Sequence, residues 1–442
     1  MRRVCAASCH RLEPRGWRSP GRMPRAVARR EAATGEQADV EAACSGGGMM
    51  MREVVVSLCH EMLLYLQAVK NDDAKQAFKH YRAAFRVFVE DNALLGARGG
   101  NSGWLLPTLA TMSRGVRLLA KEVGLDDGKA QADVTSLLHT AFSACLRDRS
   151  TDPVESKKQM AMHMAVVLFK HCFKINSFKM CQDLSRNVRG GTGDAESLAV
   201  RADVVGFLYY EGLTFMHTAA NDQHQRANAE KTLTRALKEC HYEARGNRRR
   251  ILANLVPLRM RMGCLPERDL LEKHDLLVFD DFSTALRYGD IQRFSLLIEQ
   301  HQRTLILSDL LPHLEECRQI IYRQILKKIV AATGAHTLPL SVVMLGFALK
   351  GYEFETDNPD HGRYYTPEDQ ELARFDELKM MLGSLITNGL ISGVVRSAGS
   401  QLLLSKKTPF PPLPGRSDLG RRPPSRHLNN LTATSAFNFY SA

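Results

Sequence analysis

The chain has 442 residues, of which 44% are hydrophobic and 24% are charged, so it can bury a large core and is not disordered as a whole. Its longest apolar stretches fall well short of the ~20 residues that a membrane-spanning helix requires, and we therefore expect a soluble protein without membrane contact. The ten cysteines include no CxxC pair and follow no clear secretory signal, which favours reduced thiols in the cytosol or nucleus.

The positive charge is concentrated at the two ends of the chain. The formal net charge is +12, and residues 1–30 contain nine arginines against a single acidic residue. Residues 415–442 contribute a further +3, which leaves only +1 for residues 31–414. Any nucleic-acid surface on the folded body must therefore be a local patch, because the body as a whole has almost no net charge.

Residues 1–50 are predicted to form a disordered, arginine-rich tail, since they are rich in Arg, Ala, Gly and Ser and show no helical period. Two other interpretations remain open. An Arg-rich, acid-poor start also resembles an organelle transit peptide, and the true start of the chain could be Met49, Met50 or Met51. At the other end, residues 411–442 are predicted to form a disordered, proline-rich tail.

Residues 51–302 are predicted to form a helical-repeat region. Segments such as 74–91 and 157–175 place apolar residues three and four positions apart, as an amphipathic helix requires. Loops containing Gly, Asn and Asp separate the segments, and no alternation of period two predicts a sheet. Short antiparallel helices that recur at roughly 35–40 residues favour an α-solenoid of tetratricopeptide or HEAT-like repeats. In the helix pair 204–218 and 226–240, the small residues that would allow a close approach are Gly212, Ala219 and Ala229.

The segment NRRRILANLVPLRMRMGCLP, Asn247–Pro266, is predicted to be a further helix of this region, kinked or interrupted at Pro257 because proline lacks a backbone donor and crowds the preceding turn. Its apolar stripe consists of Ile251, Leu252, Leu255, Leu258 and Met262. The residues predicted to face solvent or a partner are Arg248, Arg249, Arg259 and Arg261. The candidate partner-binding residues are Arg248, Arg249 and Arg250. These three could pair with carboxylates, contact RNA phosphates or remain hydrated at a helix start.

Residues 303–410 are predicted to form a winged helix, a module of three helices and a terminal β-hairpin. The helices are expected near 312–334, 339–350 and 371–388, and an acidic insertion at 351–370 separates the last two. Gly389 suits a left-handed end of the third helix. The hairpin is expected where LISGVV is followed by the turn RSAGS and by QLLLSKK. The basic residues expected on the outer face of the first helix are Arg318, Arg323, Lys327 and Lys328.

No stretch of the sequence predicts an enzyme. There is no GxxxxGK[ST] loop and no GxSxG, and the sequence at His60 lacks the second histidine of HExxH. The pairs His171–Cys172 and Cys240–His241 are adjacent on amphipathic helices and diverge by about 100°, so neither can chelate one metal ion. We therefore expect no catalytic residue, metal, cofactor or small-molecule substrate. A hydrolase or metalloenzyme is the alternative that a bound metal would reveal.

A helical-repeat body that runs directly into a C-terminal winged helix resembles the architecture of PCI domains. Within that class the chain is similar to the family of PCI domain-containing protein two, the PCI subunit of the nuclear transcription-export complex two. The stretches that carry this resemblance are GWLLPTLATMSRGVRLLA, NRRRILANLVPLRMRMGCLP, LLEKHDL, LITNGLISGVV and LLLSKKTPFPPLP. The resemblance covers roughly residues 61–414. The chain departs from the family in its arginine-rich start, which replaces part of an N-terminal helical region, and in the acidic insertion.

The resemblance implies a non-enzymatic scaffold subunit of an mRNA export complex, located in the nucleus at the nuclear pore, with the cytoplasm as a second compartment. It implies two protein partners, a Sac3-like scaffold protein whose winged helix lies beside that of this chain and a small acidic Sem-like protein that clamps the assembly. It further implies that the joined winged helices bind RNA or DNA. The alternative is a PCI subunit of a proteasome-lid or signalosome-like assembly without a nucleic-acid role.

The candidate nucleic-acid-binding residues are Lys379 on the third helix and Arg396, Lys406 and Lys407 on the wing, because these elements of a winged helix usually contact phosphates. Between Leu314 and Pro409 the sequence has eleven basic and eleven acidic residues, and nine of the acidic ones lie between residues 351 and 377. This segregation favours a positive face elsewhere on the module. Ordinary hydrated charges, or lysines that protect an exposed strand edge, explain each single residue equally well.

Overall fold

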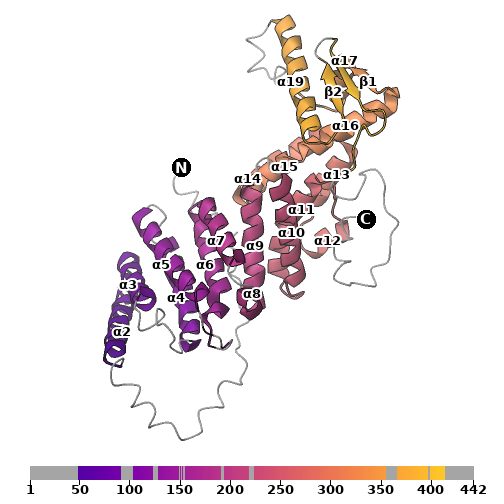
Figure 1. The fold of residues 1–442 in the computed structure, drawn as a ribbon. Coiled ribbons are helices and arrows are strands. Elements are labelled where there is room, and N and C mark those ends of the chain that lie inside the picture. Colours follow the sequence, from indigo (N-terminus) through magenta and orange to yellow (C-terminus); the bar gives the residue numbers. More distant parts are fainter. Residues whose placement is uncertain are drawn as a thin grey trace. The chain divides into compact units, whose positions relative to one another are not determined.

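The computed structural model contains two compact units, which divide between His241 and Tyr242. Figure 1 shows that helices dominate both units and that, among the residues described, the strands belong to the end of the second unit. Most of the two predicted tails and the middle of the acidic insertion lie outside the described residues. The described residues are 48–90, 103–122, 128–148, 150, 152, 155–190, 194–218, 223–354, 366–396 and 399–413.

The described part of the first unit consists almost entirely of helices. In Figure 1 successive helices lie side by side, with α2 against α3 and α9 against α10. The mainly α-helical repeat fold expected from the sequence is confirmed. The elements are α2 (Gly48–Lys70), α3 (Ala74–Glu90), η3 (Gly103–Leu105), α4 (Leu106–Glu122), α5 (Gly128–Leu146), η4 (Lys157–Met160), α6 (Ala161–Lys174), α7 (Phe178–Gly190), α8 (Asp194–Leu198), α9 (Arg201–Thr218) and α10 (Gln223–Glu239).

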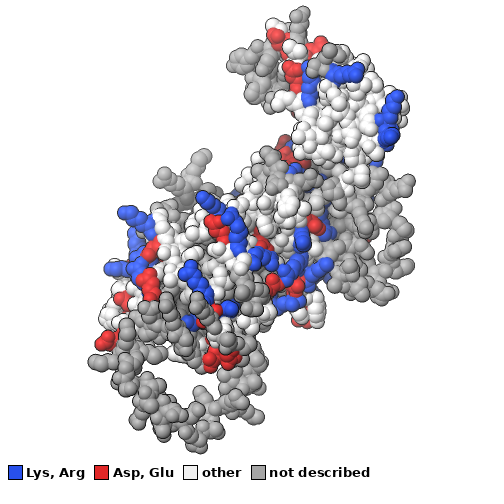
Figure 2. Space-filling view, viewed as in Figure 1, with Lys and Arg blue, Asp and Glu red and all other residues white. Residues whose placement is uncertain are grey.

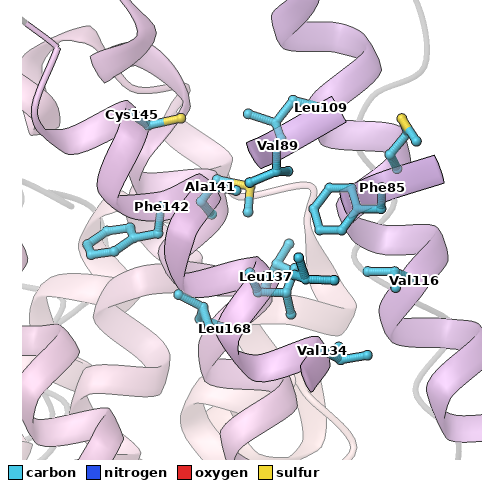
Figure 3. Packing of buried hydrophobic residues seen from close by; sticks show 14 of the residues in the cluster. Phe85, Val89, Leu109, Val116, Val134, Leu137, Ala141, Phe142, Cys145 and Leu168 are labelled. Atoms are coloured by element: carbon cyan, nitrogen blue, oxygen red, sulfur yellow. The ribbon is translucent and has the colours of Figure 1, made fainter. Parts of the chain in front are cut away.

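The core of the first unit lies where several helices meet, as Figure 3 shows. Phe85 of α3, Leu109 of α4, Leu137 of α5 and Leu168 of α6 are each at most 1% exposed. Burying such a side chain contributes roughly 1.5–3 kcal/mol to folding. The short helices therefore depend on their neighbours for stability, because isolated helices of this length are marginal in water.

The pairing of α9 with α10 confirms the role expected for a small residue. A Cβ atom built on Gly212 of α9 would lie 2.7 Å from Cγ of Leu233 in α10, so only glycine allows the two helices to pack at this distance. Ala229 is fully buried on the α10 side. Ala219, the third small residue of the predicted contact, lies outside the described residues.

The second unit contains further helices and a small antiparallel sheet. Its described elements include three strands in the order β1-β3-β2, so β3 is central and the other two are edge strands. The elements are α11 (Arg245–Arg261), α12 (Arg268–Lys273), α13 (Val278–Tyr288), α14 (Ile291–Leu307), α15 (Leu311–Glu315), α16 (Arg318–Thr333), β1 (Thr337–Pro339), α17 (Leu340–Ala348), α19 (Pro367–Thr387), β2 (Gly393–Arg396) and β3 (Gln401–Leu404).

Helix α11 runs without a break through Pro257, which is buried inside it. The proline therefore marks no junction. The predicted apolar stripe is buried at Ile251, Leu252, Leu255 and Leu258. Val256 and Met260 are buried as well, so α11 is enclosed on more sides than one amphipathic face would require.

The end of the second unit has the three helices and the hairpin of a winged helix. Strands β2 and β3 pair antiparallel, with Arg396 opposite Gln401 next to the turn, as expected. Helix α19 begins four residues earlier than expected, because the Thr366 side chain accepts a hydrogen bond from the Asp369 amide at 3.2 Å and caps the helix start. Gly389 follows α19 with a φ of +68°, in the left-handed region expected for it.

Strand β1 is the element of the winged helix that sequence reasoning missed. It spans three residues directly before α17 and pairs with β3, with Leu338 opposite Leu402. A strand this short shows no recognisable alternation, and Pro339 argues against a central strand. Its edge position accommodates the proline, and Leu338, which is 1% exposed, anchors the strand in the core.

Candidate partner and nucleic-acid surfaces

The basic residues predicted on the wing lie at opposite ends of the hairpin. Arg396 is exposed at the turn, where β2 ends. Lys406 and Lys407 are exposed just beyond Leu404, which is paired with Gly393 at the other end. Three residue steps along β2 separate these ends by about 10 Å. The structure therefore keeps the two lysines together and sets Arg396 apart from them.

Lys379 on α19 is already paired with an acidic residue of its own helix. Its Nζ lies 2.9 Å from Asp376 Oδ1, and its side chain is 27% exposed. Helix α19 carries five acidic residues against Arg374 and Lys379. Figure 2 shows acidic side chains gathered over α19 and separate basic groups elsewhere on the winged helix. Lys379 thus remains a predicted contact, but its surroundings disfavour a phosphate.

The two described ends of the acidic insertion are fixed to the winged helix. At its start, the Tyr352 hydroxyl donates a hydrogen bond to Glu377 Oε1 at 2.5 Å, and the ring packs edge-on against Tyr322. Burial, followed by the hydrogen bond to Glu377, raises the pKa of Tyr352, so the phenol stays neutral and donates. At its end, Thr366 caps α19. Residues 355–365 of the insertion lie outside the described residues.

Of the three arginines that begin α11, Arg249 is engaged within the fold. Its guanidinium donates to the Asp275 carbonyl oxygen at 3.2 Å and lies 3.2 Å from the Asp275 carboxylate. Asp275 follows α12 with a φ of 55°, so the contact links the start of α11 to the end of α12. The carbonyl oxygen of Arg250 accepts a hydrogen bond from Asn254 within α11.

Arg248 contributes to a group of cations around a buried histidine. His274 is 7% exposed. Burial lowers the pKa of His274, and the nearby charges of Arg248, Lys273 and Arg245 lower it further. The imidazole is therefore neutral at pH 7, and the three cations concentrate positive charge where α11 and α12 meet. Composition could not locate this group, because Lys273 and Arg245 are distant from each other in the sequence.

We expect acidification to destabilise the second unit through His274. Its folded-state pKa lies below that of the unfolded chain, about 6.5. Between these two values the unfolded state binds more protons, so stability falls as the pH drops below about 6.5. Thermal unfolding of the chain and of His274→Gln at pH 7.5 and pH 5.5 measures this effect. The variant should lose less stability on acidification, and an equal loss in both proteins would contradict the assignment.

Two arginines of α11 that were predicted to face outward do not, and these expectations were wrong. Arg259 is 6% exposed. Arg261, whose side chain is 17% exposed, forms an ion pair with Glu316. The physical reason is that α11 is buried on several sides, so positions that a single amphipathic face would leave in water are covered as well.

Arg323 of α16 was also predicted to face outward and is 2% exposed. Its Nε donates to the Leu390 carbonyl oxygen at 3.0 Å, and its Nη2 donates to the Pro411 carbonyl oxygen at 2.8 Å. The guanidinium also lies over the Phe410 ring, 5.6 Å from the ring centroid. One buried side chain thus connects α16 to the end of α19 and to the segment that follows β3.

The segment Pro409–Leu413 is a packed part of the second unit, although 411–442 was predicted as a tail. Leu413 is 8% exposed. A Cβ atom built on Gly263, which follows α11, would lie 2.3 Å from Leu413 Cδ1, and Gly263 has a φ of +84°. The segment therefore spans from the winged helix to the end of α11. We name it the C-terminal strap.

The first unit contains a buried ion pair that sequence reasoning missed. The Glu211 side chain on α9 is 3% exposed, and Arg189 from the end of α7 donates to both of its carboxylate oxygens, at 3.0 and 2.5 Å. Ser185 donates to the same carboxylate at 2.5 Å. The hydrogen bonds to Glu211 raise the pKa of Arg189. A glutamate amid the apolar residues of helix 204–218 was the available signal.

The described residues contain no group of three or more His, Cys, Asp or Glu side chains that could hold a metal ion. In the same part of the chain, no helix combines the length and apolar character needed to cross a membrane. What the structure does present is a set of surfaces: two sheet edges, two exposed lysines after β3, and the cations beside His274.

Paired helices that lead into a winged helix form the architecture expected of a PCI subunit. The chain is similar to PCI domain-containing protein 2 of Danio rerio, with 27% identity over 362 residues that cover 78% of this chain and 82% of the relative. It is also similar to the PCI domain-containing protein 2 homolog of Dictyostelium discoideum, with 28% identity over 70% of each chain. Protein CSN12 homolog of Mycosarcoma maydis is 26% identical over 76% of each chain. No family model matches the chain.

Several relatives of that name, at 26–28% identity over about 70–80% of the chain, support its place in the family of PCI domain-containing protein 2. The same relatives support the role of a PCI scaffold subunit that acts with protein partners.

Proposed function

We propose that the chain is a non-enzymatic scaffold subunit of a nuclear-pore-associated mRNA export complex. It docks a Sac3-like scaffold protein and a small acidic Sem-like protein, and its winged helix contributes to RNA or DNA binding. The observation that carries this proposal is the sheet order β1-β3-β2, which leaves β2 as an edge strand on which Val394 is 63% exposed. An edge strand with an exposed apolar side chain is prone to pair with another chain, and the winged helix of a second PCI-type protein is a suitable neighbour.

The cations where α11 and α12 meet support an acidic partner. Arg248, Arg245 and Lys273 act together on His274, so a carboxylate-rich peptide would find several positive charges in one place. Arg249 contributes less to this surface, because Asp275 already holds its guanidinium. We assign Arg248, together with Arg245 and Lys273, to the surface for the small acidic subunit, because these three cations act on the same histidine.

Lys406 and Lys407 carry the nucleic-acid part of the proposal. They are neighbours and both exposed. We expect Lys406→Glu with Lys407→Glu to weaken RNA binding by the assembled complex. Loss of two phosphate contacts should reduce the slope of log affinity against log salt by about 1.4 for single-stranded RNA. Fluorescence anisotropy at several salt concentrations measures both quantities.

A matched control separates a local contact from a change of net charge. Lys174→Glu with Lys179→Glu alters two exposed lysines of the first unit by the same amount. This control should keep the affinity and slope of the unchanged chain. If the control and the hairpin variant behave alike, or if neither differs from the unchanged chain, the lysines after β3 are not a nucleic-acid site.

A further inference from the structure

A groove runs between α7 and α10 in the first unit, and α9 forms its floor. Figure 1 shows α9 between the other two helices, and α9 packs against both of them. The groove has a volume of about 530 Å³, which lies within the range of pockets that hold small ligands. The side chains on its two walls are polar or charged, so its ligand must carry charged or hydrogen-bonding groups.

Positive charge prevails along the groove. Among the described residues that line it, the cations are Arg186 and Arg189 of α7 and Lys231 and Arg235 of α10, whereas the carboxylate is that of Glu211. A cleft lined by one sign of charge concentrates the electric field and attracts the opposite charge. The groove therefore favours an anionic ligand.

Arg189 and Arg235 are fixed at one end of the groove by ion pairs within the fold. Both pair with Glu196 of α8, and Arg189 also holds the buried carboxylate of Glu211. These pairs keep the two guanidinium groups in place and offset much of their charge. A ligand anion must therefore be held mainly by the other two cations.

Arg186 and Lys231 are available for this task. They lie about one turn before Arg189 and Arg235 on the two walls. Arg186 is 3.3 Å from Asp183 on its own helix, but its side chain is 72% exposed. Lys231 is exposed and forms no ion pair with any residue that the structure describes. Two cations that face one groove from opposite walls are suited to a phosphate.

Beyond the cations, the groove is lined by the amide side chains of Gln182, Gln225 and Asn228. Gln225 Oε1 has almost no contact with water and accepts no hydrogen bond from the described residues, which is rare for a polar atom in a folded protein. The last side-chain torsion of glutamine is soft, so a small rotation turns this oxygen toward the groove. A ligand with an N–H or O–H group at this end supplies the missing donor.

Phe215 of α9 forms the floor beside these amides. Helices α9 and α10 pack antiparallel, because Arg201 at the start of α9 pairs with Glu239 at the end of α10. The end of α9, which contains Phe215, therefore lies beside the start of α10, which contains Gln225. The Phe215 ring is partly exposed and lines the groove. An aromatic ring in such a position is a platform on which a flat base can stack.

The spacing of these groups matches a nucleotide. Gln225 and Lys231 are six residues apart on α10, which separates them by about 9 Å along the helix axis. In a nucleotide, a comparable distance separates the phosphate from the far edge of the base. That edge carries hydrogen-bond donors and acceptors, which amide side chains can match with their own acceptor and donor.

We propose that this groove binds a nucleoside phosphate, with the phosphate between Arg186 and Lys231 and the base stacked on Phe215. The amides of Gln225 and Asn228 hydrogen bond to the edge of the base, which supplies the donor that Gln225 Oε1 lacks. Free nucleotides and single-stranded RNA present the same phosphate and base, so both are sources of this ligand. The proposal does not depend on the proposed export function, which places nucleic acid on the winged helix.

The first test is titration calorimetry of the full chain with ATP. We expect one site per chain and a dissociation constant in the micromolar range. Tripolyphosphate carries the phosphates without the base and should bind at least ~10-fold more weakly, because it makes neither the stacking nor the amide contacts. Asn228→Ala should weaken the binding of ATP and leave that of tripolyphosphate unchanged. If tripolyphosphate binds as tightly as ATP, the groove has no site for a base and the proposal fails.

Arg186→Glu with Lys231→Glu tests the phosphate end. We expect the dissociation constant for ATP to rise at least ~10-fold, because two cations that contact phosphate become anions. Lys75→Glu with Lys79→Glu changes two exposed lysines of α3 by the same charge and serves as the control. The control should bind ATP like the unchanged chain, and circular dichroism verifies that each variant is folded. Equal weakening by both pairs would reduce the effect to net charge and overturn the proposal.

A labelled adenosine oligoribonucleotide tests RNA as the source of the ligand. The chain used here also carries Lys406→Glu and Lys407→Glu, so that the proposed site after β3 does not contribute. RNA that ATP displaces, and that Arg186→Glu with Lys231→Glu weakens, identifies single-stranded RNA as the source. Binding of ATP without binding of the oligonucleotide identifies a free nucleotide. Either result supports the site.

A chain that binds neither ATP nor the oligonucleotide at millimolar concentration would overturn the proposal. Binding of ATP that Arg186→Glu with Lys231→Glu leaves unchanged would do the same, because the phosphate then lies elsewhere. If a glutamate-rich peptide binds in the groove and neither nucleotide probe does, the occupant is an acidic peptide and the proposal is wrong.

Discussion

Replacing Arg323 with methionine is expected to lower the free energy of unfolding of the second unit by about 3 kcal/mol. The change removes the donors for the Leu390 and Pro411 carbonyl oxygens, to which Arg323 donates at 3.0 and 2.8 Å. The first acceptor lies just after α19, and the second belongs to the C-terminal strap. Hydrogen bonds from a charged donor contribute more to stability than neutral ones. In addition, a carbonyl oxygen that is shielded from water and has no donor costs the free energy of its lost hydration.

Urea unfolding followed by circular dichroism measures the loss, and hydrogen exchange locates it. We expect faster exchange in the C-terminal strap, because Arg323 donates to its Pro411 carbonyl oxygen, although the Ser392 amide still donates to the Pro409 carbonyl oxygen at 2.9 Å. Arg303→Met on α14 removes an exposed arginine of the same unit and should change stability by less than about 0.5 kcal/mol. If Arg323→Met is as harmless as this control, the buried guanidinium does not hold the strap.

Replacing Arg189 with methionine should destabilise the first unit by about 3 kcal/mol, because it leaves the Glu211 carboxylate buried with Ser185 as its remaining donor. The Arg189 side chain is 41% exposed, so the folded chain spends little free energy on desolvating it. Removing the arginine therefore recovers little free energy to offset the loss. Thermal or urea unfolding measures the change. Arg186→Met, one turn earlier on α7 and 72% exposed at its side chain, is the matched control and should have little effect.

A double-mutant cycle separates the buried charge from the lost packing. Adding Glu211→Gln to Arg189→Met removes the charge and keeps the shape of the side chain. We expect the double variant to be more stable than Arg189→Met alone. If the double variant is less stable than Arg189→Met, and its loss equals the sum of the losses of the two single variants, the carboxylate and the guanidinium do not act as a pair.

Local patterns of the sequence were sufficient for most of the fold. Helical periods and loop residues predicted the repeat region, and the turn residues before Gln401 predicted the hairpin, because both features depend on neighbours within a few positions. Strand β1 could not be found in this way. Its three residues acquire strand character by pairing with β3, more than sixty positions later in the chain, and no local pattern records that partner.

Buried arginines show the same limit. The carbonyl oxygens that receive Arg323 come from residues 67 and 88 positions away, so periodicity alone predicted an outward side chain. Lys379 is different, because Asp376 lies three positions earlier on the same helix and such pairs are visible in a sequence. The count of basic and acidic residues between Leu314 and Pro409 concealed this pairing, because it does not record which charges are neighbours. The grouping of Arg248 with Lys273 depends on the fold, which brings the start of α11 beside the residues that follow α12, where Arg249 contacts Asp275.

The central claim is that the chain is the PCI subunit of an mRNA export complex, and the chains that purify with it test this claim most directly. Affinity purification of the full chain from nuclear extract, followed by mass spectrometry, identifies them. We predict a Sac3-like scaffold protein together with a small acidic Sem-like protein, in amounts comparable to the chain itself. Recovery of a set of other PCI subunits, as in a proteasome lid or signalosome, without a Sac3-like protein would contradict the account.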